Sequence, residues 1–227
     1  MAATLGLSLP VASEPAMRGS WIFSCASTVT EVEIAPGDSR RLTFSHTNAD
    51  SLARRIRIVL ELAPLDGGAV PDAWRFDAAG CQGDYGLLWD TYIAAAVKTC
   101  PLNLPPNQQS VWHATSLAQE GDRLRLEFER VFGGPPDVAT GDRLVLSLRF
   151  DHLWSVAGPA TDAEHCGGFE RGVCVRLIEA THESFAGLVR PYVRTNSVYS
   201  ANAGGLGSCE VVPVRATTWG AIKGQYR

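Results

Sequence analysis

The stretch from Arg143 to Trp154 (RLVLSLRFDHLW) carries an apolar side chain or an aromatic ring at every even-numbered position. These positions are Leu144, Leu146, Leu148, Phe150, His152 and Trp154. Because successive side chains of a β-strand point to opposite faces, a period of two predicts a strand with one face in the core and the other in solvent. His152 shares the apolar face, so we expect a buried, hydrogen-bonded histidine there rather than a catalytic one.

The same alternation recurs along the chain. It is clearest in three segments, Arg41–Thr47, Arg55–Leu62 and Arg123–Arg130. Weaker patterns predict two further strands, Thr28–Ile34 and Glu210–Ala216. Turn-forming residues such as Pro36-Gly37-Asp38 separate these segments. Half-polar strands at short, repeated spacing predict an all-β fold, an antiparallel β-sandwich that is immunoglobulin-like or jelly-roll-like.

Helical periodicity is scarce and the chain has no obvious internal boundary. Only Leu88–Lys98 and Glu183–Leu188 could form short helices. No linker rich in Pro, Ser or charge divides the strands, so we predict a single domain over residues 20–216. Residues 1–19 are predicted to be a signal-peptide remnant or an N-terminal arm. Residues 217–227 are predicted to be a C-terminal tail that either recognises a partner or packs against its own domain.

The charge balance and the N-terminal sequence exclude some classes of partner. The 227 residues contain 20 Lys and Arg against 24 Asp and Glu, a net charge of −4, which leaves no basic surplus for a nucleic acid. The apolar stretch Ala2–Ala12 is far shorter than the ~20 residues of a membrane-spanning helix, so no transmembrane segment is expected. The small residues Val11-Ala12-Ser13 fit a signal-peptide cleavage site, although no basic residue precedes Arg18.

The six cysteines form an even set without a C-x-x-C pair, which favours disulfides over zinc or iron-sulfur ligation. Proximity in sequence favours the pairs Cys81–Cys100 and Cys166–Cys174, which leaves Cys25 and Cys209 to join the first strand to the last. Disulfides predict export to an oxidising compartment. The alternative is a cytosolic protein with buried free thiols.

Residues Gly80–Ser110 show little alternation, contain two cysteines and end in a Pro-rich segment, so we predict a disulfide-stapled loop excursion from the sandwich. Aromatic rings and carboxylates in or near it form the candidate ligand site. Its residues are Trp74, Asp84, Tyr85, Trp89, Asp90 and Trp112. Flat rings cover apolar sugar faces while carboxylates accept hydroxyl hydrogen bonds, so the expected ligand is a glycan. Alternatively, the rings fill the core beneath a long loop.

Motifs for catalysis and for cofactors are absent from the sequence. It contains no G-x-S-x-G serine elbow, no H-E-x-x-H zinc motif and no phosphate-binding glycine loop, so we predict no metal and no cofactor. Oxygen ligands for calcium could come from the loop around Cys166, but its spacing is not that of an EF-hand, and a solvated loop pinned by a disulfide is favoured. That loop contains Asp162, Glu164, His165 and Glu170.

The segment Ile34-Ala35-Pro36-Gly37-Asp38, followed by Leu42-Thr43-Phe44 and Thr47-Asn48, resembles the early strands of secreted bacterial immunoglobulin-like domains. The resemblance covers about residues 28–62. It implies a structural or binding role, because such domains occur in surface proteins, adhesins and biofilm-matrix fibres.

Taken together, these features predict a secreted or cell-surface, non-catalytic β-sandwich module with a structural, adhesion or matrix role. Its expected partner is a glycan or another surface protein. The alternative is a secreted, glycosidase-like hydrolase on a β-sandwich scaffold, with Asp84 and Asp90 as the paired acids. Unpaired sheet edges also predict self-assembly by strand addition, with Ala2–Ser13 or the C-terminal tail as the donated strand.

Overall fold

The computed structural model describes residues 14–22, 25–47, 53–77, 80–82, 112–131, 142–160, 165–204 and 209. These residues form eleven strands and a single 3-10 turn. The strands are β1 (Ala16–Ser20), β2 (Glu31–Val32), β3 (Ser39–Thr47), β4 (Ala53–Pro64), β5 (Trp112–Glu120), β6 (Arg123–Val131), β7 (Arg143–Asp151), β8 (Val173–Ser184), β9 (Val189–Pro191), β10 (Val193–Arg194) and β11 (Val198–Ala201), and the 3-10 turn η1 is Asp72–Trp74.

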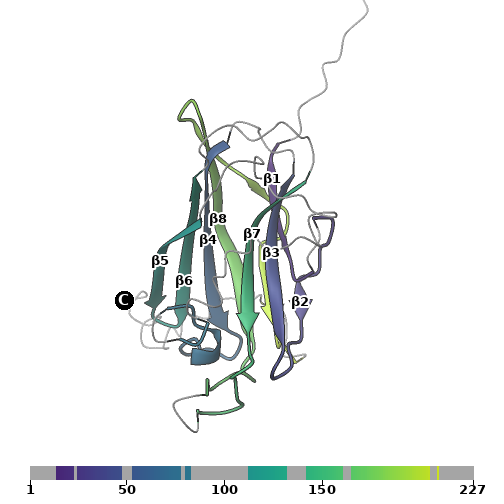
Figure 1. Ribbon diagram of the computed structural model, residues 1–227, viewed down its shortest axis with the longest axis vertical. Coiled ribbons are helices and arrows are strands. Elements are labelled where there is room, and N and C mark those ends of the chain that lie inside the picture. Colours follow the sequence, from purple (N-terminus) through teal and green to yellow (C-terminus); the bar gives the residue numbers. More distant parts are fainter. Residues whose placement is uncertain are drawn as a thin grey trace, which may run out of the picture.

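The strands form two sheets that share one core (Figure 1). The smaller sheet has the order β10-β1-β3-β7, and the larger has the order β2-β11-β8-β4-β6-β5, with β9 also paired to β8. All pairings are antiparallel except β1 with β10 and β2 with β11. The predicted all-β, mainly antiparallel sandwich with little helix is therefore confirmed for the described residues.

The segments with the clearest alternation coincide with β3, β4, β6 and β7, but β7 ends earlier than predicted. The backbone of His152 still pairs with the turn before β3, because its N–H donates to Asp38 O and its C=O accepts from Gly37 N, both at 3.0 Å. Leu153 and Trp154 then form a turn, so the alternation of faces stops and Trp154 points to solvent instead of the core. The prediction that Trp154 is an inward residue is wrong for this reason.

Other sequence predictions change in detail. Of the weak segment Thr28–Ile34, only β2 is strand, and Glu183–Leu188 is the end of β8 and a hairpin turn rather than a helix. β1 places Ala16–Ser20 inside the sandwich, ahead of the predicted boundary at residue 20, because its backbone pairs with both β3 and β10. The predicted helix 88–98, the predicted strand 210–216 and the tail 217–227 lie outside the described residues.

The core lies between the inner faces of the two sheets. Leu42, Leu148 and Phe150 of the smaller sheet face Ile58 and Leu60 of the larger sheet, and all five are buried. Each Å² of apolar surface that this packing removes from water stabilises the folded state by about 25 cal/mol. This burial is the main favourable contribution to the folding free energy of a sandwich of this kind.

One close contact fixes the position of β1 against β11. Tyr199 is buried, its ring meets Phe44 edge-on at 5.6 Å, and its hydroxyl accepts a 2.8 Å hydrogen bond from Gly19 N and donates to Asn196 O. Burial raises the pKa of Tyr199, so the phenol is neutral and remains a donor. Gly19 leaves the space for this ring, because a Cβ there would lie 2.6 Å from Tyr199 Cζ.

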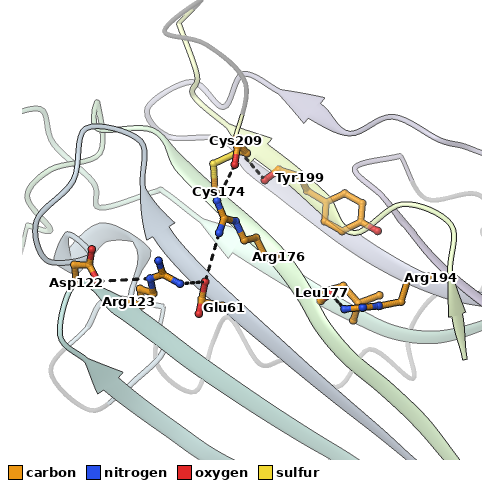
Figure 2. A network of polar contacts seen from close by, with 9 residues as sticks. All are labelled: Glu61, Asp122, Arg123, Cys174, Arg176, Leu177, Arg194, Tyr199 and Cys209. Atoms are coloured by element: carbon orange, nitrogen blue, oxygen red, sulfur yellow. Dashed lines mark hydrogen bonds and ion pairs between the residues drawn. A yellow bond between two sulfur atoms is a disulfide. The ribbon is translucent and has the colours of Figure 1, made fainter. Parts of the chain in front are cut away.

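The outer face of the larger sheet carries ion pairs between side chains of neighbouring strands. Arg57 Nε lies 2.7 Å from a Glu127 carboxylate oxygen, and its Nη1 lies 2.6 Å from a Glu179 oxygen. The bond to Glu127 is the main reason that the pKa of Arg57 is raised. Figure 2 shows a second group of ion pairs further along β4, where Glu61 accepts from Arg123 at 2.9 Å and lies 4.0 Å from Arg176. These contacts join β6, β4 and β8 and keep this face polar.

The predicted pairing of neighbouring cysteines is wrong. Cys81 bonds Cys166, 85 residues away. Cys174 bonds Cys209, 35 residues away (Figure 2). Cys25 is also disulfide-bonded, but its partner is not Cys209. The physical reason is strand pairing: Cys174 lies opposite Ser200 of β11, and Cys209 follows β11 closely, so these two sulfurs meet.

Candidate functional site

The predicted ligand site is only partly described. Asp84, Tyr85, Trp89 and Asp90 lie outside the described residues, and Trp112 is placed only as the first backbone position of β5. Trp74 is fully buried, and its ring centroid lies 5.9 Å from that of Phe150. Trp74 therefore belongs to the core and offers no face to a ligand. For Trp74 alone, this is the alternative in which an aromatic ring fills the core.

The beginning of the excursion is attached firmly to the end of β7. The amide of Gln82 is fully buried; its nitrogen donates to Ala73 O at 2.6 Å and to Asp151 O at 2.9 Å, and its oxygen accepts from Asp151 N at 2.8 Å. The neighbouring Cys81 is bonded to Cys166. The Cys81–Cys166 disulfide and the three hydrogen bonds of the Gln82 amide therefore fix the chain where it leaves the sandwich.

The loop that follows β7 is held by the same disulfide. Cys166 N donates to Trp154 O at 2.9 Å, and Val156 N donates to Cys166 O at 2.8 Å, forming a parallel bridge between Ser155 and Cys166. Trp154 therefore has its backbone bound to a disulfide-linked residue. Its indole is nonetheless 66% exposed, and the adjacent Leu153 is 56% exposed. We call Leu153 and Trp154 the apolar pair.

The inner side of this loop is an aromatic cluster. The His152 ring is buried between two aromatic rings. Its centroid lies 4.4 Å from that of Trp74 and 4.7 Å from that of Phe169. The Nδ1 atom of His152 lies 3.0 Å from Ser155 Oγ. Burial lowers the pKa of His152 to about 4, although Asp151 acts in the opposite direction. The imidazole is therefore neutral near pH 7, and the prediction of a buried, hydrogen-bonded histidine is confirmed.

Ser155 and His152 do not form a working nucleophile and base. His152 Nε2 is buried without a hydrogen-bond partner, so no carboxylate of the described residues orients the ring. Ser155 is itself buried. A neutral imidazole with a pKa of about 4 is also a poor general base at neutral pH. The pair is a structural hydrogen bond that fixes the turn beneath Trp154.

Charged side chains lie beside the apolar pair. The Asp151 carboxylate accepts from Leu153 N at 3.2 Å and lies 2.8 Å from the Arg149 guanidinium. Asp38, in the turn that pairs with His152, forms a further ion pair at 2.7 Å with Arg40 of β3. A small apolar surface beside polar groups is the usual anatomy of a recognition site.

In the predicted acidic loop around Cys166, the described carboxylate of Glu170 forms a structural hydrogen bond. Asp162 and Glu164 lie outside the described residues, whereas the Glu170 carboxylate accepts a 2.8 Å bond from Gly158 N. Within the described part of the chain, no three His, Cys, Asp or Glu side chains are grouped to hold a metal ion. No helix among the same residues is long and apolar enough to cross a membrane.

Comparisons with known proteins return distant structures alone. No family model and no curated protein sequence matches the chain. A type II cohesin domain from the Acetivibrio cellulolyticus cellulosome matches with a TM-score of 0.40 and 8% identity, covering 85% of this chain and 97% of that one. A non-cellulosomal cohesin from Archaeoglobus fulgidus matches with a TM-score of 0.38 and 11% identity, covering 83% and 91%. At these values the similarity carries no conclusion about function.

The apolar pair could not be recognised from the sequence. The alternation that defines β7 continues in parity to Trp154, and nothing in the local sequence marks the turn at residue 153. Leu153 is an apolar residue at an odd-numbered position, where the polar face is expected, but Val145 within β7 is another, so this departure does not mark the turn either.

Proposed function

We propose that this protein is an exported, non-catalytic β-sandwich module with an adhesion, matrix or structural role, which binds a glycan or a surface protein through the loop after β7. The observation that carries the proposal is that the indole of Trp154 is exposed while its backbone carbonyl accepts a hydrogen bond from Cys166, which is disulfide-bonded to Cys81. The predicted relation to immunoglobulin-like surface domains is part of the same proposal.

The disulfides support the exported location. Cys81–Cys166 and Cys174–Cys209 each join segments that lie far apart in the sequence, and such bonds persist in oxidising compartments. A reducing cytosol would open both bonds and release the constraint on the Trp154 loop. Extracellular or cell-surface placement is therefore consistent with the way the proposed site is held.

The geometry of the loop supports binding. Tryptophan is enriched at the energetic centres of interfaces and stacks on the apolar faces of sugars, because its large ring loses little conformational entropy on binding. The Trp154 backbone is already ordered by its bond to Cys166, so less ordering remains to be done when a partner binds. Asp151 and Arg149 next to the apolar pair can accept and donate hydrogen bonds to sugar hydroxyls.

A glycan-array screen of the oxidised protein tests this proposal. Variants Trp154→Ala and Trp89→Ala separate the loop after β7 from the predicted excursion site. Val189→Ala is the matched control, because Val189 is equally exposed at 65% but belongs to a different part of the sandwich. We expect at least a tenfold loss of glycan binding in Trp154→Ala and no loss in Val189→Ala. Equal binding of all four proteins would contradict the site, and silence of all of them would contradict a glycan partner.

A further inference from the structure

The hairpin between β8 and β9 presents a rigid apolar tip. Ser184 N donates to Leu188 O at 2.9 Å, Gly187 N donates to Ser184 O at 2.9 Å, and Leu188 N donates to Ser184 Oγ at 3.2 Å. Gly187 has φ +78, the left-handed conformation that closes a three-residue hairpin loop. These bonds give the backbone of the tip a defined shape.

The exposed side chains of this hairpin are unusual for a turn. Turns are normally built from Gly, Pro, Asn, Asp and Ser, but here Phe185 is 39% exposed, Leu188 57% and Val189 65%. Grouped exposed apolar residues mark an interaction site rather than a random surface. In Figure 1 the hairpin projects at the top of the molecule, whereas the loop that follows β7 lies at the bottom.

Uncompensated positive charge accompanies the apolar tip. Arg54 is exposed in the bulge of β4 between Ala53, which pairs with Ser184, and Arg55, which pairs with Glu183. Arg190 of β9 is also exposed, two residues after Leu188. Neither Arg54 nor Arg190 forms an ion pair with another described residue. Glu183, the acid beside them, lies 3.5 Å from Arg55. Among the described residues beside the hairpin, Arg54 and Arg190 therefore present two guanidinium groups without an ion-pair partner, although the chain carries a net charge of −4.

We propose that the β8–β9 hairpin docks on an anionic phospholipid bilayer. Phe185, Leu188 and Val189 enter the boundary between headgroups and acyl chains, and Arg54 and Arg190 bind lipid phosphates. A projecting apolar tip with adjacent free guanidinium groups matches a surface that is negative outside and apolar beneath. A protein pocket would bury the tip equally well, but it supplies no general reason for two arginines that have no ion-pair partner among the described residues. Docking in this way directs the Trp154 loop away from the bilayer.

Vesicle co-sedimentation of the full, oxidised chain tests the proposal. The vesicles are pure phosphatidylcholine or a 70:30 mixture of phosphatidylcholine and phosphatidylglycerol. We expect binding to the anionic vesicles at 0.1 M salt and loss of binding at 0.5 M salt. Arg54→Gln with Arg190→Gln should weaken binding about 25-fold, about fivefold for each charge, which corresponds to ~1 kcal/mol per arginine near the surface. Leu188→Ser with Val189→Ser should weaken it at least tenfold.

Controls separate this site from the rest of the protein. Trp154→Ala removes an exposed apolar side chain from the loop after β7 and should leave vesicle binding unchanged, so failure of the glycan proposal does not affect this test. Near-ultraviolet circular dichroism checks that each variant is folded. A wild-type protein that stays in the supernatant with anionic vesicles at low salt overturns the proposal. So does equal binding to neutral vesicles, or a concentration-dependent dimer that the hairpin variant abolishes without any vesicle binding.

Discussion

The buried His152 should make the stability of this protein fall on mild acidification. Its pKa is lowered from 6.5 to about 4 by burial, so the folded state resists a proton that the unfolded state accepts. Well above pH 6.5 the imidazole is neutral in both states and its contribution to stability is complete. As the pH falls from 6.5 towards 4, only the unfolded state binds the proton, and the free energy of unfolding decreases.

The size of this effect follows from the shift. A difference of about 2.5 pKa units at about 1.36 kcal/mol per unit gives a maximum loss of ~3.4 kcal/mol at pH values well below 4. Between pH 7.5 and pH 5.0 the expected loss from His152 is about 2 kcal/mol, because the unfolded-state histidine is then almost fully protonated.

Urea unfolding at pH 7.5, 6.5, 5.5 and 5.0 measures this loss in wild-type protein and in His152→Gln. Other groups that titrate contribute equally to both proteins, so the difference between their unfolding free energies isolates His152. That difference should shrink by about 2 kcal/mol between pH 7.5 and 5.0. Ser155→Ala is the matched control, because it removes the 3.0 Å hydrogen bond to the ring but leaves the imidazole in place. Its curve should fall with pH as the wild-type curve does.

The reasoning fails if the difference between wild type and His152→Gln is constant with pH to within about 0.5 kcal/mol, which is less than half a pKa unit. Such a result would mean that His152 gains protons in the folded state almost as readily as in the unfolded state. The aromatic cluster around His152 would then be accessible to water. The conclusion that a buried His152–Ser155 hydrogen bond fixes the turn beneath Trp154 would be wrong.

Three further predictions concern the sandwich. Gly19→Ala should destabilise the protein by about 1–3 kcal/mol in urea unfolding, because the new Cβ would lie 2.6 Å from Tyr199 Cζ and 2.9 Å from Phe44 Cε1; an unchanged unfolding midpoint would refute the close contact. Replacing both Cys81 and Cys166 by Ala should cost about 4.6 kcal/mol and replacing both Cys174 and Cys209 about 3.8 kcal/mol, from the 85- and 35-residue separations; a larger loss from the second pair would contradict the chain-entropy argument. Arg57→Met should cost no more than about 1 kcal/mol for each lost ion pair, and the loss should decrease in 1 M salt; a salt-independent loss would show that these pairs are not screened.

Much of the sandwich could be predicted because its information is local. A period of two is a property of the strand itself, so β3, β4, β6 and β7 and the buried face of His152 follow directly from residue order. β1 was missed because five residues that include Gly19 carry too little pattern, and it becomes a strand through its pairing with β3 and β10. The candidate site was missed because strand parity does not indicate where a strand ends.

The amino-acid sequence settled the class of fold, the polar face of the larger sheet and the tendency of the cysteines to form disulfides, since each depends on the composition and spacing of nearby residues. The tertiary structure decided the disulfide partners, the position of Arg54 beside the hairpin and the exposure of Trp154. Cys81 meets Cys166, and Arg54 lies near the β8–β9 hairpin, because pairing brings together segments that are distant along the chain. Trp154 is exposed because the backbone turns after His152 has paired with the turn before β3. Contacts of this kind depend on the relative positions of several strands, which no local pattern encodes.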